Sequence, residues 1–119
     1  MGITVSQLID KAFDLCGYTK SNELMKQAIT AVNIIAADIF YLNHTTGFKP
    51  VSSLSDKLQD ELQEEMIIND VIPYGVASHL AELEHDGEKQ NLYAAYYNRK
   101  RLRIGERESI VDKLPRGDW

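Results

Sequence analysis

Three histidines and several carboxylates are the side chains best suited to metal or acid–base chemistry in this sequence. His79, Glu82 and Asp86 are spaced i, i+3 and i+7, a spacing that imitates a metal-ligand set on one face of a helix. On an acidic amphipathic helix, however, such side chains are ordinarily solvated. His44 falls in a predicted loop, and six helical positions turn His85 away from His79. We therefore predict no metal site.

The other patterns that resemble catalytic or cofactor sites are incomplete. Residues 17–21 read Gly-Tyr-Thr-Lys-Ser and end like a phosphate-binding loop, but they lack its upstream glycine, the glycine before the lysine and a preceding strand. The carboxylates of residues 56–65 have no apolar surroundings to raise a pKa. Cys16 is the only cysteine, which excludes an intramolecular disulfide and a thiolate zinc site. The sequence therefore predicts no catalytic residue and no cofactor.

A basic cluster next to tyrosines is the strongest candidate for a binding surface. Residues 99–103 read Arg-Lys-Arg-Leu-Arg and end a predicted helix, where the helix dipole already favours cations. Arginine stacks on aromatic rings and forks onto carboxylates, so this helix would make a good protein interface. The same tyrosines would equally serve to cap the core. The interface candidates on this helix are Tyr93, Tyr97, Arg99, Arg101 and Arg103.

The charge distribution favours a protein partner over DNA. The net charge is −5; residues 1–98 carry 6 basic and 14 acidic side chains, whereas residues 99–119 carry 7 basic and 4 acidic ones. DNA binding needs a broad basic face to neutralise phosphates, which an acidic body does not provide. A basic C-terminal segment suits an acidic protein surface instead, including that of another copy of this chain.

The hydrophobic periodicity predicts an all-α fold of four main helices in a small bundle. With 119 residues, one domain with one core is expected. The predicted helices span residues 4–16, 21–42, about 69 to 85, and 88 to about 104, with a weaker short helix near residues 60–66. Residues 43–53 predict a loop or a small β-hairpin. Residues 1–107 form the predicted helical domain and residues 108–119 an extended C-terminal docking arm.

The sequence predicts no contact with a membrane. No run without a charged residue is longer than residues 27–37, a stretch too short and too polar to span a bilayer, and no export signal opens the chain. The lone cysteine fits a reducing compartment. We therefore expect the protein to stay in the cytoplasm where it is made.

Several segments resemble the head-tail connector (adaptor, or head-completion) proteins of long-tailed bacteriophages. The run at residues 69–77, Asn-Asp-Val-Ile-Pro-Tyr-Gly-Val-Ala, carries this resemblance together with Leu-Ala at 80–81, Asp-Gly at 86–87, and the tyrosines at 93, 96 and 97 that precede the arginines. Residues 48–51 resemble the family's loop between helices, and residues 109–117 its extended C-terminal segment. The resemblance spans most of the chain.

The resemblance implies a virion structural protein that is not an enzyme. Members of the family form a ring, commonly of twelve copies, beneath the portal protein, which extends the DNA channel and provides the platform for tail attachment. The implied partners are other copies of the chain, the portal protein and a tail-side stopper or completion protein. Packaged DNA passes through without specific binding, and the implied location is the head-tail interface of the virion.

The residues make physical sense of such a ring. A ring contact joins two different faces, which suits an acidic body with a basic end. An acidic channel wall would let DNA pass without holding it, and the candidates for it are Asp56, Asp60, Glu61, Glu64 and Glu65. In the arm, the candidate anchors are Ile110, Leu114, Arg116 and Trp119. The alternative is a small cytoplasmic regulatory or DNA-binding helical module whose basic fourth helix touches phosphate.

Overall fold

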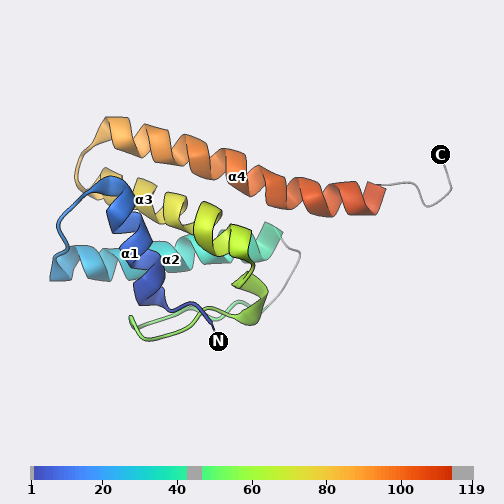
Figure 1. Ribbon diagram of the computed structural model, residues 1–119, viewed down its shortest axis with the longest axis horizontal. Coiled ribbons are helices and arrows are strands. Elements are labelled where there is room, and N and C mark those ends of the chain that lie inside the picture. Colours follow the sequence, from blue (N-terminus) through green and yellow to red (C-terminus); the bar gives the residue numbers. More distant parts are fainter. Residues whose placement is uncertain (1, 43–46, 114–119) are drawn as a thin grey trace.

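The protein is a mostly helical chain, as the sequence predicted. The computed structural model describes residues 2–42 and 47–113, with side chains described through residue 104, and contains no β-strand within these ranges. Its four α-helices are α1 (Val5–Cys16), α2 (Asn22–Leu42), α3 (Ile72–Leu83) and α4 (Gly87–Lys113), shown in Figure 1. Helix α3 packs against each of the other three, so one core forms around it. No helix in the described part of the chain is long and apolar enough to cross a membrane.

Local signals at both ends define α1. Thr4 is the N-cap and forms a capping box with Gln7, in which each side chain bonds the backbone N–H of the other residue. Gly17 ends the helix with φ 75°, a left-handed conformation that glycine adopts without a steric penalty. The predicted bounds of this helix are therefore confirmed. Its buried face is Val5, Leu8, Ile9, Ala12, Phe13 and Cys16.

Helix α2 follows after a short turn and supplies the long side of the core. The hydroxyl of Ser21 accepts the backbone N–H of Leu24 at 3.1 Å and so caps the first turn. The helix buries Ala28, Ala31, Val32, Ile35, Ala36, Ile39 and Phe40, most of the predicted stripe. Ile34 and Tyr41 lie on its other side and are exposed.

The described segment after α2 is irregular chain. The sequence predicted a loop or a small β-hairpin for residues 43–53, and residues 47–53 form no β-hairpin. Residues 43–46, with His44, lie outside the described part. The backbone instead returns to the start of α1, where Val5 N–H donates to the carbonyl of Asp56 at 2.9 Å and Thr4 forms one isolated bridge with Lys57. The amide of Asn33 on α2 donates to and accepts from the backbone of Val51. These bonds hold the segment without a sheet.

Helix α3 begins behind a short π-helix, η2 (Ile67–Val71). Pro73 is the second residue of α3, so its missing N–H falls where the π-helix passes into the α-helix. Gly75 permits close approach to α2, because a Cβ at this position would lie 2.7 Å from Cδ1 of Ile35. Helices α2 and α3 therefore pack more closely at Gly75 than any side chain would allow.

Helix α4 is longer than the sequence predicted, and the side that it buries carries tyrosines. It continues through Gly105 to Lys113, so residues 108–113 are helical where an extended arm was predicted; residues 114–119 lie outside the described part. Its C-terminal half extends past the other helices (Figure 1). Tyr93, Tyr97 and Ile104 face the core, whereas the leucines Leu92 and Leu102 on the same helix are 47% and 57% exposed.

Candidate functional site

The cationic side of α4 is the candidate site. Arg99, Lys100 and Arg103 surround a hollow of about 110 Å³ that Tyr96 completes. The four residues are spaced i, i+3, i+4 and i+7, so the helix brings them onto one face. Within the part of the chain whose side chains are described, no carboxylate lies within ion-pairing distance of the three cations. We call these four residues the basic surface.

Aromatic rings hold two of these cations in place. The guanidinium of Arg99 lies 5.2 Å from the ring centroid of Tyr96, and the ammonium of Lys100 lies 5.1 Å from that of Tyr74. The Tyr74 ring packs in turn against the rings of Tyr96 and Tyr93, with centroids 5.4 Å and 6.0 Å apart. Cation–π contacts of this kind restrict the rotamers of long side chains. The basic surface is thus partly ordered before any anion arrives.

Two predicted interface tyrosines are part of the core instead. Tyr93 and Tyr97 are each only 9% exposed. The hydroxyl of Tyr93 donates to the carbonyl of Leu15 on α1, and that of Tyr97 donates to Asp38 on α2 at 2.7 Å. Of the two roles open to these tyrosines, the structure supports that of capping the core. Neither is available to a partner.

Arg101 is also engaged within the fold. Its Nε and Nη2 donate to the two carboxylate oxygens of Asp38 at 2.7 Å and 2.9 Å. The Arg101 guanidinium and the Tyr97 hydroxyl hold the pKa of Asp38 below its ordinary value, while burial and the bond to Asp38 raise the pKa of Tyr97. The predicted arginine set therefore divides: Arg99 and Arg103 are exposed, and Arg101 ties α4 to α2.

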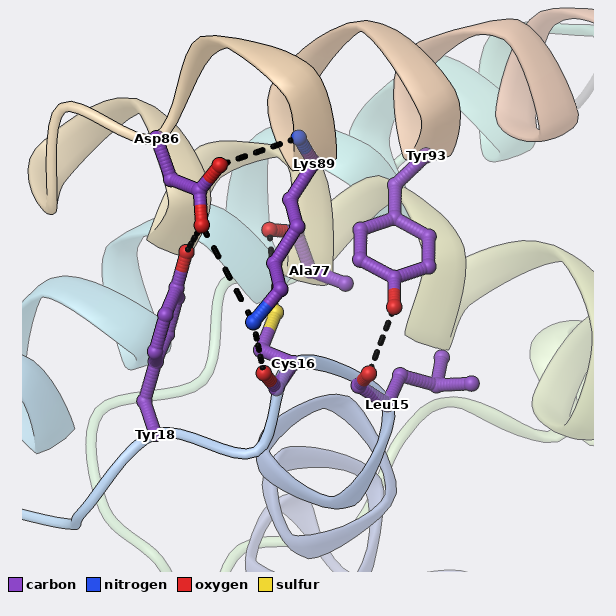
Figure 2. A network of polar contacts seen from close by, with 7 residues as sticks. All are labelled: Leu15, Cys16, Tyr18, Ala77, Asp86, Lys89 and Tyr93. Atoms are coloured by element: carbon purple, nitrogen blue, oxygen red, sulfur yellow. Dashed lines mark hydrogen bonds and ion pairs between the residues drawn. The ribbon is translucent and has the colours of Figure 1, made fainter.

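A second polar network fixes the start of α4 against the end of α1 (Figure 2). Asp86 accepts the backbone N–H of Lys89 at 3.2 Å, as an N-cap does, and the Tyr18 hydroxyl at 3.0 Å. The Lys89 ammonium donates to the carbonyl of Cys16 at 2.7 Å. Burial raises the pKa of the Cys16 thiol to about 11, so this thiol is neutral and unreactive. The network positions α4 and carries no chemistry of its own.

The acidic candidates for a channel wall are distributed unequally. Asp56 is engaged in a turn, because its carboxylate accepts the backbone N–H groups of Ser52 and Ser53, which lower its pKa. The other four lie in or next to the short η1 turn (Asp60–Leu62) and are exposed: Asp60, Glu61, Glu64 and Glu65. In Figure 1 this segment and α4 occupy opposite long sides of the molecule.

The remaining features bring no further chemistry together. A hollow of about 330 Å³ between α1 and the start of α3 is lined by Lys11, Asp14, Leu15, Asn69, Pro73 and Tyr74. Among the described residues, no group of three or more His, Cys, Asp or Glu side chains is placed to hold a metal. The side chain of Ile110 and residues Leu114, Arg116 and Trp119 lie outside the part whose side chains are described.

Sequence reasoning missed Asp38 and Tyr74. Asp38 had a usable signal, since it is the one carboxylate in the apolar stretch of α2 and such a group needs a cation or a hydroxyl. Tyr74 had none, because its contact with Lys100 joins residues whose proximity depends on the packing of α3 against α4.

Fold and surface together define a small all-α protein with a preformed cationic patch on its last helix. No model of a protein family, no curated protein and no solved structure matches the chain.

Proposed function

We propose that this chain is a head-tail connector of a long-tailed bacteriophage, which forms a ring beneath the portal, extends the DNA channel and provides the platform for tail attachment. The single observation that carries the proposal is the basic surface. Three cations stand together on a chain of net charge −5, with no carboxylate among the described side chains in ion-pairing distance, beside rings that restrict two of them. Such a surface suits an acidic protein partner.

The distribution of exposed groups supports a ring more than a symmetric pair. The basic surface lies on α4, and the acidic residues around η1 lie on the other long side of the molecule (Figure 1). Contacts between unlike faces are heterologous, and a heterologous contact closes into a ring when the rotation between copies allows it. In such a ring the basic surface would meet an acidic surface of the next copy other than the one around η1. Asp60, Glu61 and Glu65 would then line the channel, where like charge repels DNA phosphates.

The resemblance at residues 69–77 is the second support. The structure gives these residues packing roles: Pro73 starts α3, Tyr74 carries the aromatic contact to Lys100, and Gly75 lets α2 approach. These roles explain why such a run is useful to the fold of α3. The proposed partners follow from the resemblance, and they are other copies of the chain, the portal protein and a tail-side completion protein.

The test is the mass of the purified protein in solution, alone and mixed with candidate portal rings of long-tailed phages, by light scattering behind a sizing column. We expect a ring, alone or on the portal. R99E/R103E should lose this assembly, whereas K26E/K49E, which changes the charge equally at exposed lysines away from α4, should keep it. A monomer or dimer that ignores the portal and binds DNA would contradict the proposal and favour the regulatory or DNA-binding module.

A further inference from the structure

The turn between α3 and α4 carries several exposed acidic residues, whose charge is opposite to that of the basic surface. Residues 82–84 read Glu-Leu-Glu, and residues 101–103 read Arg-Leu-Arg. Leu83 at the end of α3 is 44% exposed and Leu102 is 57% exposed. Each exposed leucine is therefore flanked in the sequence by charges of one sign, and the two signs are opposite; beside Leu102, only Arg103 is exposed, since Arg101 is paired with Asp38.

The acidic group is free to meet a partner. Glu82, Glu84 and Glu88 are exposed, and of their described side chains only that of Glu82 has a hydrogen bond, to the half-buried Gln90 at 3.2 Å. Within the described side chains, no hydrogen bond or ion pair holds the carboxylates of Glu84 and Glu88. Asp86, between them, is committed to Tyr18 and to the cap of α4. We call Glu82, Leu83, Glu84 and Glu88 the acidic turn.

The acidic turn cannot reach the basic surface of its own chain. Glu88 in the acidic turn lies eleven residues before Arg99 on the same helix, a distance of about 16 Å at 1.5 Å per residue. A straight helix holds these two points apart. Any contact between them must join two copies, and because the two surfaces differ, that contact is heterologous.

The chemistry of the two surfaces matches. The hollow of the basic surface, about 110 Å³, has room for a carboxylate. The Arg99 and Arg103 guanidiniums present forked donors, which bind carboxylates bidentately. Leu102 is a helix-surface neighbour of Arg99 and offers apolar area next to the hollow, where Leu83 of a second copy would lose water.

We propose that the acidic turn of one copy docks on the basic surface of the next, with Leu83 against Leu102 and the carboxylate of Glu84 or Glu88 in the hollow. The closure of this contact into a ring rests on the proposed function, whereas the contact itself does not. The surface is small, so association of the free protein should be weak, and screening of exposed charges should weaken it further as salt rises.

Engineered disulfides test the geometry in the full-length protein. One preparation carries Leu83→Cys and the other Leu102→Cys; Cys16 stays in both, since it is only 2% exposed. Under mild oxidation the mixture should give a covalent heterodimer at least tenfold in excess of either homodimer. Leu83→Cys mixed with Leu92→Cys is the matched control, because Leu92 is similarly exposed on α4 but lies ten residues from Leu102. Predominant homodimers of Leu102→Cys, or no heterodimer, would overturn the proposal.

A charge exchange tests the partner. E84R/E88R and R99E/R103E should each weaken self-association at least tenfold, measured by sedimentation velocity at low salt, and an equimolar mixture of the two should recover it to within a few fold. Circular dichroism checks that both variants keep their helices. The proposed contact is wrong if neither the wild type nor the equimolar mixture associates. It is also wrong if E84R/E88R has no effect and R99E/R103E only loses the binding of an oligonucleotide.

The two proposals fail separately. Heterodimers and charge exchange in the absence of portal binding would keep the contact between copies and remove the connector function. Assembly on the portal without either signal would keep the connector function and remove this contact.

Discussion

Arg101 and Asp38 form a two-point ion pair across the α2–α4 contact, with N–O distances of 2.7 Å and 2.9 Å. The pair is partly buried, with side chains 27% and 33% exposed, and Asp38 also accepts the Tyr97 hydroxyl. One carboxylate thus satisfies three donors from α4. Because those donors have no other partner in the described structure, the carboxylate decides how α4 is oriented on α2.

Asp38→Asn should lower the free energy of unfolding by about 1–3 kcal/mol, since Arg101 and Tyr97 lose a charged acceptor that a neutral amide does not replace. Urea titration at neutral pH measures the change. Asp70→Asn, at an exposed aspartate, is the control and should alter stability by less than about 0.5 kcal/mol. Equal losses in the two variants would show that the α2–α4 ion pair contributes nothing.

The same carboxylate should make stability depend on acid pH. The pKa of Asp38 is lower in the folded protein than in the unfolded chain, so its contribution is full above the ordinary aspartate pKa of about 3.9 and disappears as the pH falls through the lowered value. Wild type should therefore lose more stability than Asp38→Asn on acidification below about pH 4. Parallel curves of unfolding free energy against pH for the two proteins would contradict this prediction.

Alkaline pH should also destabilise the fold. Burial raises the pKa of Cys16 from 9.0 to about 11, so between these values the unfolded chain loses a proton that the folded protein keeps. The stabilising effect is complete below pH 9.0 and is lost as the pH rises towards 11. Thermal melts from neutral pH upward should show this decline, and it should be shallower in Cys16→Ala. A thiol reagent should react slowly with the native protein and rapidly in urea.

Gly75→Ala should destabilise the protein although alanine favours helices by about 1 kcal/mol. The new Cβ would lie 2.7 Å from Cδ1, 2.8 Å from Cγ1 and 3.0 Å from Cγ2 of Ile35, so the whole branched side chain must move. Overpacking of this kind costs about 1–3 kcal/mol. Chemical denaturation of Gly75→Ala, Ile35→Ala and the double variant should give a double variant less destabilised than the sum of the two. Strict additivity would mean that the two residues do not meet.

Asp86→Ala should cost about 1–3 kcal/mol, because the start of α4 loses its cap and Tyr18 loses its acceptor. Tyr18→Phe removes only the second of these bonds and should cost about 1 kcal/mol. Unfolding of both variants in urea separates the two contributions. A Tyr18→Phe variant as unstable as Asp86→Ala would assign the effect to the tyrosine alone and contradict the capping role.

The helix boundaries near the N-terminus were predictable because their determinants are local. The Thr4–Gln7 capping box and Gly17 lie in or directly next to α1, and the apolar period of residues 21–42 is long enough to predict a helix despite individual exceptions. The C-terminal end of α4 was mispredicted because Gly105 was interpreted as a stop. Glycine weakens a helix interior by about 1 kcal/mol and does not by itself end it.

The candidate site was predictable only in part. The cluster of basic residues was evident from composition, and Arg99 and Arg103 are indeed exposed. The assignment of Arg101, Tyr93 and Tyr97 to the same surface failed, because their partners lie far away in the sequence and on other helices. Arg101 and Tyr97 are 63 and 59 positions from Asp38, and Tyr93 is 78 positions from Leu15. Spacing along one helix says which residues share a face but does not identify what that face meets.

The sequence by itself determined that this protein is helical, where its first helices begin and end, and that its exposed charge separates into an acidic body and a basic last helix. Only the tertiary structure decided which side of α4 is buried. Apolar leucines on one side and tyrosines on the other compete for the core, and the tyrosines are buried because the Leu15 carbonyl and the Asp38 carboxylate accept their hydroxyls. Leu92 and Leu102 stay exposed as a result, since a helix buries only one side at a time.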